Sequence, residues 1–212
     1  MKTEDKTCRQ FINELSSAAP APGGGGAAAM CGALAVSLGN MVGALTVGKK
    51  KYADAEDEIK RLMKESERLK GELLALVDED ARCFEPLSAS YRLPKSTQEE
   101  CSLRAEAIEE NLKLACSAPL KIMEACAEAT ELISAFAEKG SVTVLSDAGC
   151  GASLCRGALA AAAMNVYINT KAMKDREYAG AVNARADELL EVYSAKAQGI
   201  EASVLGKLRG QP

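Results

Sequence analysis

Two aspartates in the segment LVDEDARCFEP, Asp78 and Asp80, have the type and spacing to do chemistry. Residues two apart on a helix diverge by about 200°, so at most one of these carboxylates can lie on the apolar face. Val77, Asp80 and Phe84 follow the i, i+3, i+7 spacing of a single face, which selects Asp80. A carboxylate on an apolar face costs free energy unless it has a task or a partner.

The complete absence of histidine sharpens the interpretation of Asp80. It excludes Ser-His-Asp and Cys-His mechanisms, so any proton transfer falls to a carboxylate, Lys, Tyr or Cys. Asp80 is therefore the leading candidate for an acid/base catalyst. The structural alternative is a partly buried acid paired with Arg82, Arg92 or a lysine.

A second chemical feature is Pro22 followed by four glycines, Gly23, Gly24, Gly25 and Gly26. Glycine leaves its backbone uncovered, and the first N–H groups of a helix have no intrahelical partners. A helix that begins here predicts one wall of a binding site for an anionic or carbonyl-bearing ligand. A flexible entry to a core helix explains the same residues equally well.

Two amides in a later apolar segment, Asn165 and Asn169, are spaced i, i+4 and share a helical face. Buried amides must be hydrogen-bonded, so these side chains either bind a ligand or connect helices. The sequence leaves both alternatives open.

The elements that must position these residues are two helices rich in Ala and Gly. The first has small residues at four-residue spacing: Ala27, Cys31, Ala35, Gly39, Gly43 and Val47. Such a face lets a partner helix approach closely. The segment 23–47 has no charge and could span a bilayer, but its Ala, Gly and interspersed polar residues favour a central helix of a soluble bundle. The segment 149–173 has a similar composition, and the two are expected to pack together.

Composition sets the fold class. The 212 residues are 48% hydrophobic but only 4% aromatic, with no Trp, which favours helices packed through Ala, Leu and Met. We expect an all-α bundle of about six helices, with the two Ala/Gly-rich helices at its centre. Residues 1–212 should form a single domain. These two Ala/Gly-rich segments offer more flat, uncharged surface than one small chain needs for its core, so the chain is expected to dimerise.

Charge and cysteine usage exclude several classes of partner. A net charge of -4 offers no basic surplus for nucleic acid. The eight cysteines include no CxxC pair and there is no histidine, so no metal site is expected. They are better explained as small buried hydrophobes than as disulfides. No signal peptide precedes the first polar residues, which predicts a cytoplasmic protein without membrane partners.

The motifs together resemble one family. They are PAPGGGGAAA, GNMVGALTVGKKKY, LVDEDARCF, LPKSTQEE, VLSDAG and NVYINTKAMKD, which cover nearly the whole chain. The chain is similar to the cyclodeaminase/cyclohydrolase family: the C-terminal domain of formiminotransferase-cyclodeaminase and its stand-alone bacterial relatives. One position departs from the family pattern, because Gly26 stands where P-G-G-G-S has its serine.

The resemblance implies an all-helical homodimer that acts on one-carbon tetrahydrofolate derivatives and uses no other cofactor. It implies cyclodeamination of 5-formiminotetrahydrofolate, hydrolysis of 5,10-methenyltetrahydrofolate, or both; a non-catalytic folate-binding or structural dimer is the alternative. The proposed acid/base of the family is the second Asp of D-x-D-A-x-x-F, which is Asp80. Further substrate-binding candidates from the matching motifs are Lys49, Lys50, Tyr52 and Asp147, with the two lysines suited to the carboxylates of a glutamate tail.

Overall fold

The computed structural model describes residues 3–210 and is all-helical within them, which confirms the predicted class. Its α-helices are α1 Cys8–Leu15, α2 Gly24–Ala44, α3 Glu56–Ser90, α4 Gln98–Lys139, α5 Leu145–Ala172 and α6 Arg176–Leu208. Three short 3₁₀ helices are η1 Thr3–Asp5, η2 Lys50–Ala55 and η3 Val142–Val144.

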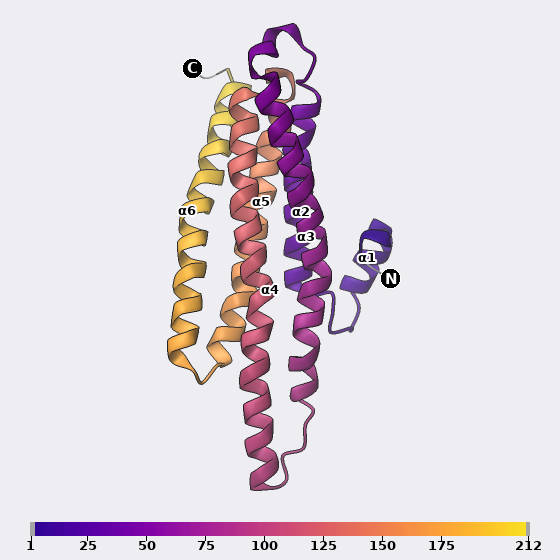
Figure 1. The fold of residues 1–212 in the computed structure, drawn as a ribbon, viewed down its shortest axis with the longest axis vertical. Coiled ribbons are helices and arrows are strands. Elements are labelled where there is room, and N and C mark those ends of the chain that lie inside the picture. Colours follow the sequence, from indigo (N-terminus) through magenta and orange to yellow (C-terminus); the bar gives the residue numbers. More distant parts are fainter. Residues whose placement is uncertain (1–2, 211–212) are drawn as a thin grey trace.

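The long helices form an elongated bundle (Figure 1). Helix α2 packs against α3, α4 and α5, and α6 covers α5 and α4. The short helix α1 lies beside the bundle, and a loop joins it to the start of α2 (Figure 1). The first turn of α2 therefore lies near the middle of the bundle, and its last turn lies at one end.

The small residues of α2 and α5 allow the close packing that the sequence predicts. A Cβ at Gly43 would lie 2.7 Å from Phe136 and 2.8 Å from Met63, and one at Gly39 would lie 3.2 Å from Phe136. On α5, a Cβ at Gly151 would lie 3.0 Å from the Ala35 carbonyl oxygen. These faces pack against helices of the same chain, so the predicted helix–helix contact is confirmed within one chain.

Helix α2 is the one helix in residues 3–210 that is apolar and long enough to cross a membrane. Half of its most apolar window is nevertheless buried inside the bundle. Burial among α3, α4 and α5 gives that apolar character a role in the protein core.

Free cysteines are spread through the bundle. None of the eight forms a disulfide, and Cys83, Cys116, Cys126 and Cys155 are buried. Burial raises the pKa of the Cys116 thiol to about 11, so this thiol stays protonated near neutral pH. These four buried cysteines act as small core residues.

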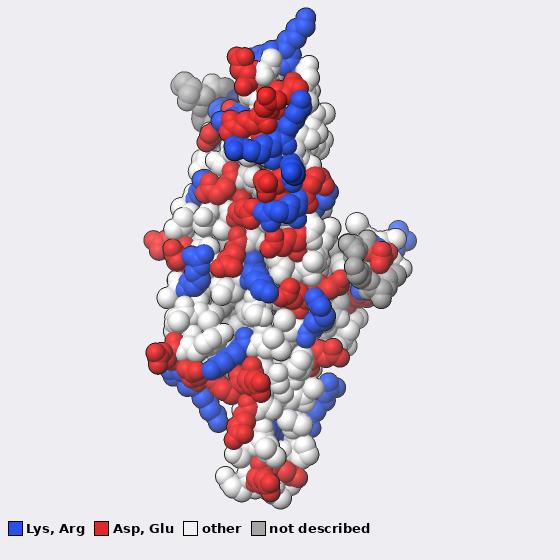
Figure 2. All heavy atoms as spheres, in the orientation of Figure 1, with Lys and Arg blue, Asp and Glu red and all other residues white. Residues whose placement is uncertain are grey.

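Charged side chains of both signs are interspersed over the face seen in Figure 2, so this face carries no extended basic patch. A different surface belongs to α2, which has no charged residue in its entire length. Leu34 and Met41 are exposed on it, and Leu45 is exposed directly after its last residue.

Candidate functional site

Asp80 on α3 points at the first turn of α2. An added Cβ at Gly25 would lie 2.2 Å from Asp80 Oδ1 and 2.6 Å from Oδ2, far inside van der Waals contact. The carboxylate therefore occupies space that any side chain at position 25 would fill. Glycine at this position is what allows the carboxylate to lie against the helix N-terminus.

The surroundings of Asp80 favour its protonated form. Burial raises the pKa of this carboxyl above its usual range, and the backbone N–H of Gly26 opposes part of that rise. Within residues 3–210, no Lys or Arg forms an ion pair with Asp80. The paired structural acid, which was the alternative interpretation, is therefore not what the structure shows.

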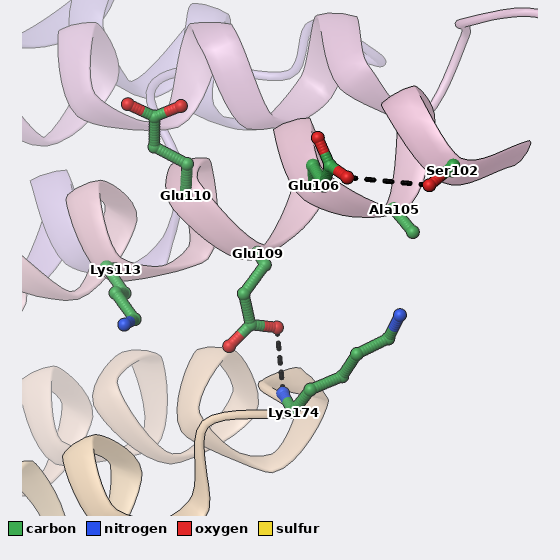
Figure 3. Close-up of a pocket in the computed structure, with 7 residues that line it drawn as sticks. All are labelled: Ser102, Ala105, Glu106, Glu109, Glu110, Lys113 and Lys174. Carbon is green, nitrogen blue, oxygen red and sulfur yellow. Dashed lines mark hydrogen bonds between the residues drawn. The ribbon is translucent and has the colours of Figure 1, made fainter. Parts of the chain in front are cut away.

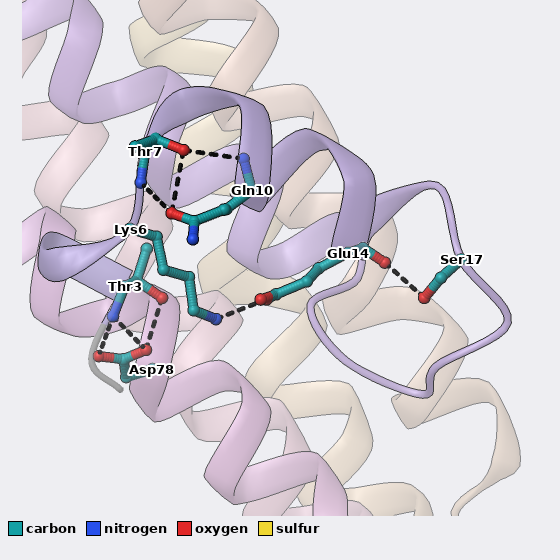
Figure 4. Close-up of polar contacts among 7 residues, drawn as sticks. All are labelled: Thr3, Lys6, Thr7, Gln10, Glu14, Ser17 and Asp78. Atoms are coloured by element: carbon teal, nitrogen blue, oxygen red, sulfur yellow. Dashed lines mark hydrogen bonds and ion pairs between the residues drawn. The ribbon is translucent and has the colours of Figure 1, made fainter.

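Asp78 has a different and structural task. Its carboxylate accepts hydrogen bonds from the Thr3 backbone N–H, at 3.2 Å to each oxygen, and from Thr3 Oγ1 at 2.6 Å (Figure 4). The same close-up shows Lys6 paired with Glu14 at 2.5 Å. Asp78 thus holds the N-terminal segment against α3.

The glycine turn forms the wall opposite Asp80. Gly23 is the N-cap of α2 and supplies no side-chain cap, which leaves the first-turn N–H groups to other acceptors. A Cβ at Gly26 would lie 3.4 Å from Val77 and 3.5 Å from Pro22, which is ordinary contact. Position 26 would therefore accommodate the serine Cβ of the family pattern without strain, and the N–H of Gly26 faces Asp80.

The two asparagines of α5 separate in role. Asn165 lies beside the turn: a Cβ at Gly24 would lie 3.1 Å from its Nδ2 and 3.2 Å from its Oδ1. Asn169 is buried and donates from Nδ2 to the Ala115 carbonyl at 3.2 Å and to the Asn165 carbonyl at 2.9 Å. Asn169 therefore connects α5 to α4, and Asn165 is the one placed to meet a ligand.

The remaining candidates lie at the far end of α2. Lys49 Nζ donates to Ser141 Oγ at 2.9 Å, and Tyr52 accepts from the Val142 N–H at 3.1 Å. This hydrogen bond lowers the pKa of the Tyr52 hydroxyl. Lys50 opens η2 and is exposed, and Asp147 lies in the first turn of α5, directly after η3.

The structure thus separates the predicted residues into two groups. Pro22, the four glycines, Asp80 and Asn165 lie together, while Lys49, Lys50, Tyr52 and Asp147 lie at the other end of α2. At 1.5 Å per residue, the 21 residues of α2 place these groups about 30 Å apart within one chain. We call the first group the Asp80 site and the second the lysine end.

A hollow of about 470 Å³ near the start of α4 is not part of either group. Glu109 lies in it and accepts a hydrogen bond from the backbone N–H of Lys174 at 2.7 Å (Figure 3). It also accepts one from the backbone N–H of Asp175 at 2.9 Å. These bonds lower the pKa of the Glu109 carboxyl. Its role is to hold the α5–α6 connection against α4.

Comparison with known proteins agrees with the motifs. Residues 7–188 match the formiminotransferase-cyclodeaminase family model. The chain is 42% identical to the methenyltetrahydrofolate cyclohydrolase of Methylorubrum extorquens over 82% of this chain and 84% of that protein. It is 34% identical to the formimidoyltransferase-cyclodeaminase of Mus musculus over 98% of this chain, which spans only 38% of the mouse protein.

The fold agrees as well. The crystal structure of formiminotetrahydrofolate cyclodeaminase from Thermotoga maritima superposes with a TM-score of 0.81, covers 98% of both chains and is 28% identical. Sequence and structure thus match along nearly the whole length of the chain. The chain belongs to the formiminotransferase-cyclodeaminase family.

Proposed function

We propose that this protein is a folate one-carbon enzyme that hydrolyses 5,10-methenyltetrahydrofolate to 10-formyltetrahydrofolate, with residues 1–212 acting as one domain. The observation that carries the proposal is the half-buried Asp80 carboxylate, which has a raised pKa and faces the N-terminus of α2. The 42% identity to a stand-alone cyclohydrolase supports hydrolysis as the reaction.

Asp80 serves first as base and then as acid. Its carboxylate takes a proton from water as the oxygen adds to the cationic amidinium carbon between N5 and N10. The proton then goes to N5 as the bond from N5 to that carbon breaks, and the hydroxyl of the adduct releases its own proton to solvent, which leaves the formyl group on N10. A pKa raised toward the working pH suits both transfers. Neither step changes an oxidation state, so we propose no redox cofactor.

The glycine turn and Asn165 would hold the ring system around this carboxylate. The uncovered N–H groups of Gly24 and Gly25 are donors for a pterin carbonyl or ring nitrogen. Asn165 keeps one Nδ2 hydrogen bond to the Ala161 carbonyl at 2.8 Å, which fixes the orientation of its amide beside the turn. These contacts bind and orient the substrate, and Asp80 moves the proton.

Cyclodeamination is the second candidate, favoured by the solved cyclodeaminase structure that covers 98% of this chain. In that reaction N10 attacks the formimino carbon of 5-formiminotetrahydrofolate, whose formimino nitrogen is already protonated. Asp80 accepts the N10 proton and returns a proton to the departing nitrogen, which leaves as ammonia. The same carboxylate in the same place serves this reaction, so geometry alone admits both.

Homodimerisation is part of the proposal. The exposed side of α2 and the adjoining side of α5 form an apolar face that includes Leu34, Met41, Met164 and Ile168, which are 55%, 46%, 68% and 64% exposed. Because a monomer rarely leaves such a face in water, we propose that a second copy covers it. The two copies of α2 would run antiparallel.

An antiparallel dimer also gives the lysine end a role. One chain cannot bring Lys49 and Lys50 to its own Asp80, because about 30 Å of α2 lies between them. In the antiparallel arrangement, the lysine end of one copy lies beside the Asp80 site of the other. We propose that the two lysines, together with Tyr52 and Asp147, act there on the outer part of a polyglutamate tail.

The dimer is tested with Met41→Glu and, as a matched control on α6, Val192→Glu, which is also exposed at 51%. We expect light scattering to give a dimer for the wild type and Val192→Glu and a monomer for Met41→Glu. Dimers of both variants with unchanged dissociation constants would remove this face from the proposal.

The reaction is tested by following the methenyl chromophore. With 5,10-methenyltetrahydrofolate, cyclohydrolase activity makes the chromophore disappear faster than in buffer. With 5-formiminotetrahydrofolate, cyclodeaminase activity makes it appear and releases ammonia. If the pure dimer produced neither change, the enzyme proposal would fail and the non-catalytic folate-binding dimer would replace it. A cytoplasmic location, supported by the eight free thiols, is the setting we propose.

A further inference from the structure

A cavity of about 280 Å³ lies on α3 next to the Asp80 site. The linker before the glycine turn forms one wall, and α3 forms the other. The residues that matter here are Pro20, Ala21, Ala81, Phe84, Arg82 and Arg92. The cavity is therefore apolar in part and carries two guanidinium groups.

Among the side chains that the structure describes, no carboxylate forms an ion pair with Arg82 or Arg92. Arg82 Nε donates a long hydrogen bond of 3.4 Å to the Asp78 backbone carbonyl. Glu85 also lines the cavity, so its side chains carry two positive charges and one negative. A net positive cavity lined by two guanidinium groups suits a carboxylate ligand.

The residues that line the cavity are sequence neighbours of the residues of the Asp80 site. On the α3 side, Ala81 directly follows Asp80, and Phe84 lies one turn further on. On the other side, Pro20 and Ala21 lead into Pro22, which contacts the turn at Gly26. The cavity and the Asp80 site therefore share the same two chain segments within one protomer.

We propose that this cavity binds the aminobenzoyl-glutamate part of the folate substrate, a statement that rests on the function proposed above. The benzoyl ring packs on Phe84 and Pro20, which are the flat apolar surfaces available. Arg82 and Arg92 bind the glutamate carboxylates. Arg82 lies on α3, and Arg92 lies just past the last residue of that helix, Ser90. Both line the one cavity, so both can reach the glutamate carboxylates without a second copy, unlike the lysine end.

The test compares Arg82→Gln, Arg92→Gln and the double variant with Arg61→Gln. Arg61 lies on the same helix, its side chain is 73% exposed, and its contact to Glu58 is a long 3.8 Å, so it is a matched control. Michaelis constants are measured for the methenyl substrate that carries one glutamate and for an analogue that ends at the benzoyl amide. Binding of p-aminobenzoyl-L-glutamate is measured by calorimetry as a readout independent of turnover.

We expect the Arg82→Gln variant to raise the Michaelis constant of the glutamate-bearing substrate about tenfold, with kcat unchanged. The analogue should be affected no more than in Arg61→Gln, and p-aminobenzoyl-L-glutamate binding should weaken in parallel. Equal changes for both substrates, or none beyond those of Arg61→Gln, would overturn the inference. Absence of turnover by the wild type with either substrate would instead refute the proposed function, so the two failures are distinguishable.

Discussion

Replacing Gly25 by alanine tests whether the position of the Asp80 carboxylate matters. The added methyl would lie 2.2 Å from Oδ1, so the carboxylate must retreat by about 1 Å to reach normal contact. A displacement of that size in a catalytic group is worth about a hundredfold in rate. Turnover in the chromophore assay should therefore fall about a hundredfold.

Gly71→Ala is the control for Gly25→Ala, because an added Cβ there meets nothing within 4 Å. It should leave turnover unchanged and stabilise α3 by about 0.5–1 kcal/mol, the helix-interior preference for Ala over Gly. Circular dichroism would show that both variants fold. If Gly25→Ala were folded and kept wild-type turnover, the close approach of Asp80 to α2 would have no catalytic role, and the reasoning would be refuted.

Three further predictions concern burial, packing and the amides. Burial raises the pKa of the Asp80 carboxyl, so the protonated side chain favours folding at acid pH, and this contribution is lost as pH rises through that pKa. Asp80→Asn should therefore have a higher melting temperature than the wild type only toward neutral pH. A difference in melting temperature that does not depend on pH would contradict this. Gly43→Ala should lower the free energy of unfolding by about 1–3 kcal/mol, because the added methyl would lie 2.7 Å from Phe136. An unchanged melting temperature would show that Phe136 can move aside without cost. Asn169→Ala should cost about 1–3 kcal/mol in urea unfolding, whereas Asn165→Ala should mainly raise the Michaelis constant; the reverse pattern would exchange the roles of these amides.

The helices are the part of the fold that the sequence predicts best. Small-residue spacing identifies α2 and α5 as close-packed helices, and Asp175 is the expected N-cap of α6, accepting the Tyr178 N–H at 3.0 Å. Pro86 predicts an end or a kink, yet α3 continues through it to Ser90. Packing of the buried Leu87 against α4 residues outweighs the lost backbone bond.

The sequence predicts the part of the candidate site that depends on the residues of a single helix. Periodicity separates Asp80 from Asp78 because that argument needs a single helix. It could not show that Thr3 holds Asp78, since 75 positions separate them in the chain. The separation of Lys49 from the glycine turn, by contrast, follows from the single helix that the sequence predicts over 23–47, and α2 confirms that helix. Arg82 and Arg92 entered only as partners for Asp80, and their cavity needs the linker wall to exist.

The most direct test of the central claim is the turnover number of Asp80→Asn, measured beside Asp78→Asn with folate affinity followed in both. Asparagine keeps the shape of the side chain and removes the titrating group. Turnover of Asp80→Asn should fall by about two to four orders of magnitude, the usual worth of general acid–base catalysis, while folate affinity changes far less. Asp78→Asn should be mild, because it alters only the hold on Thr3. Wild-type turnover in Asp80→Asn, or equal losses in the two variants, would contradict the assignment of proton transfer to Asp80.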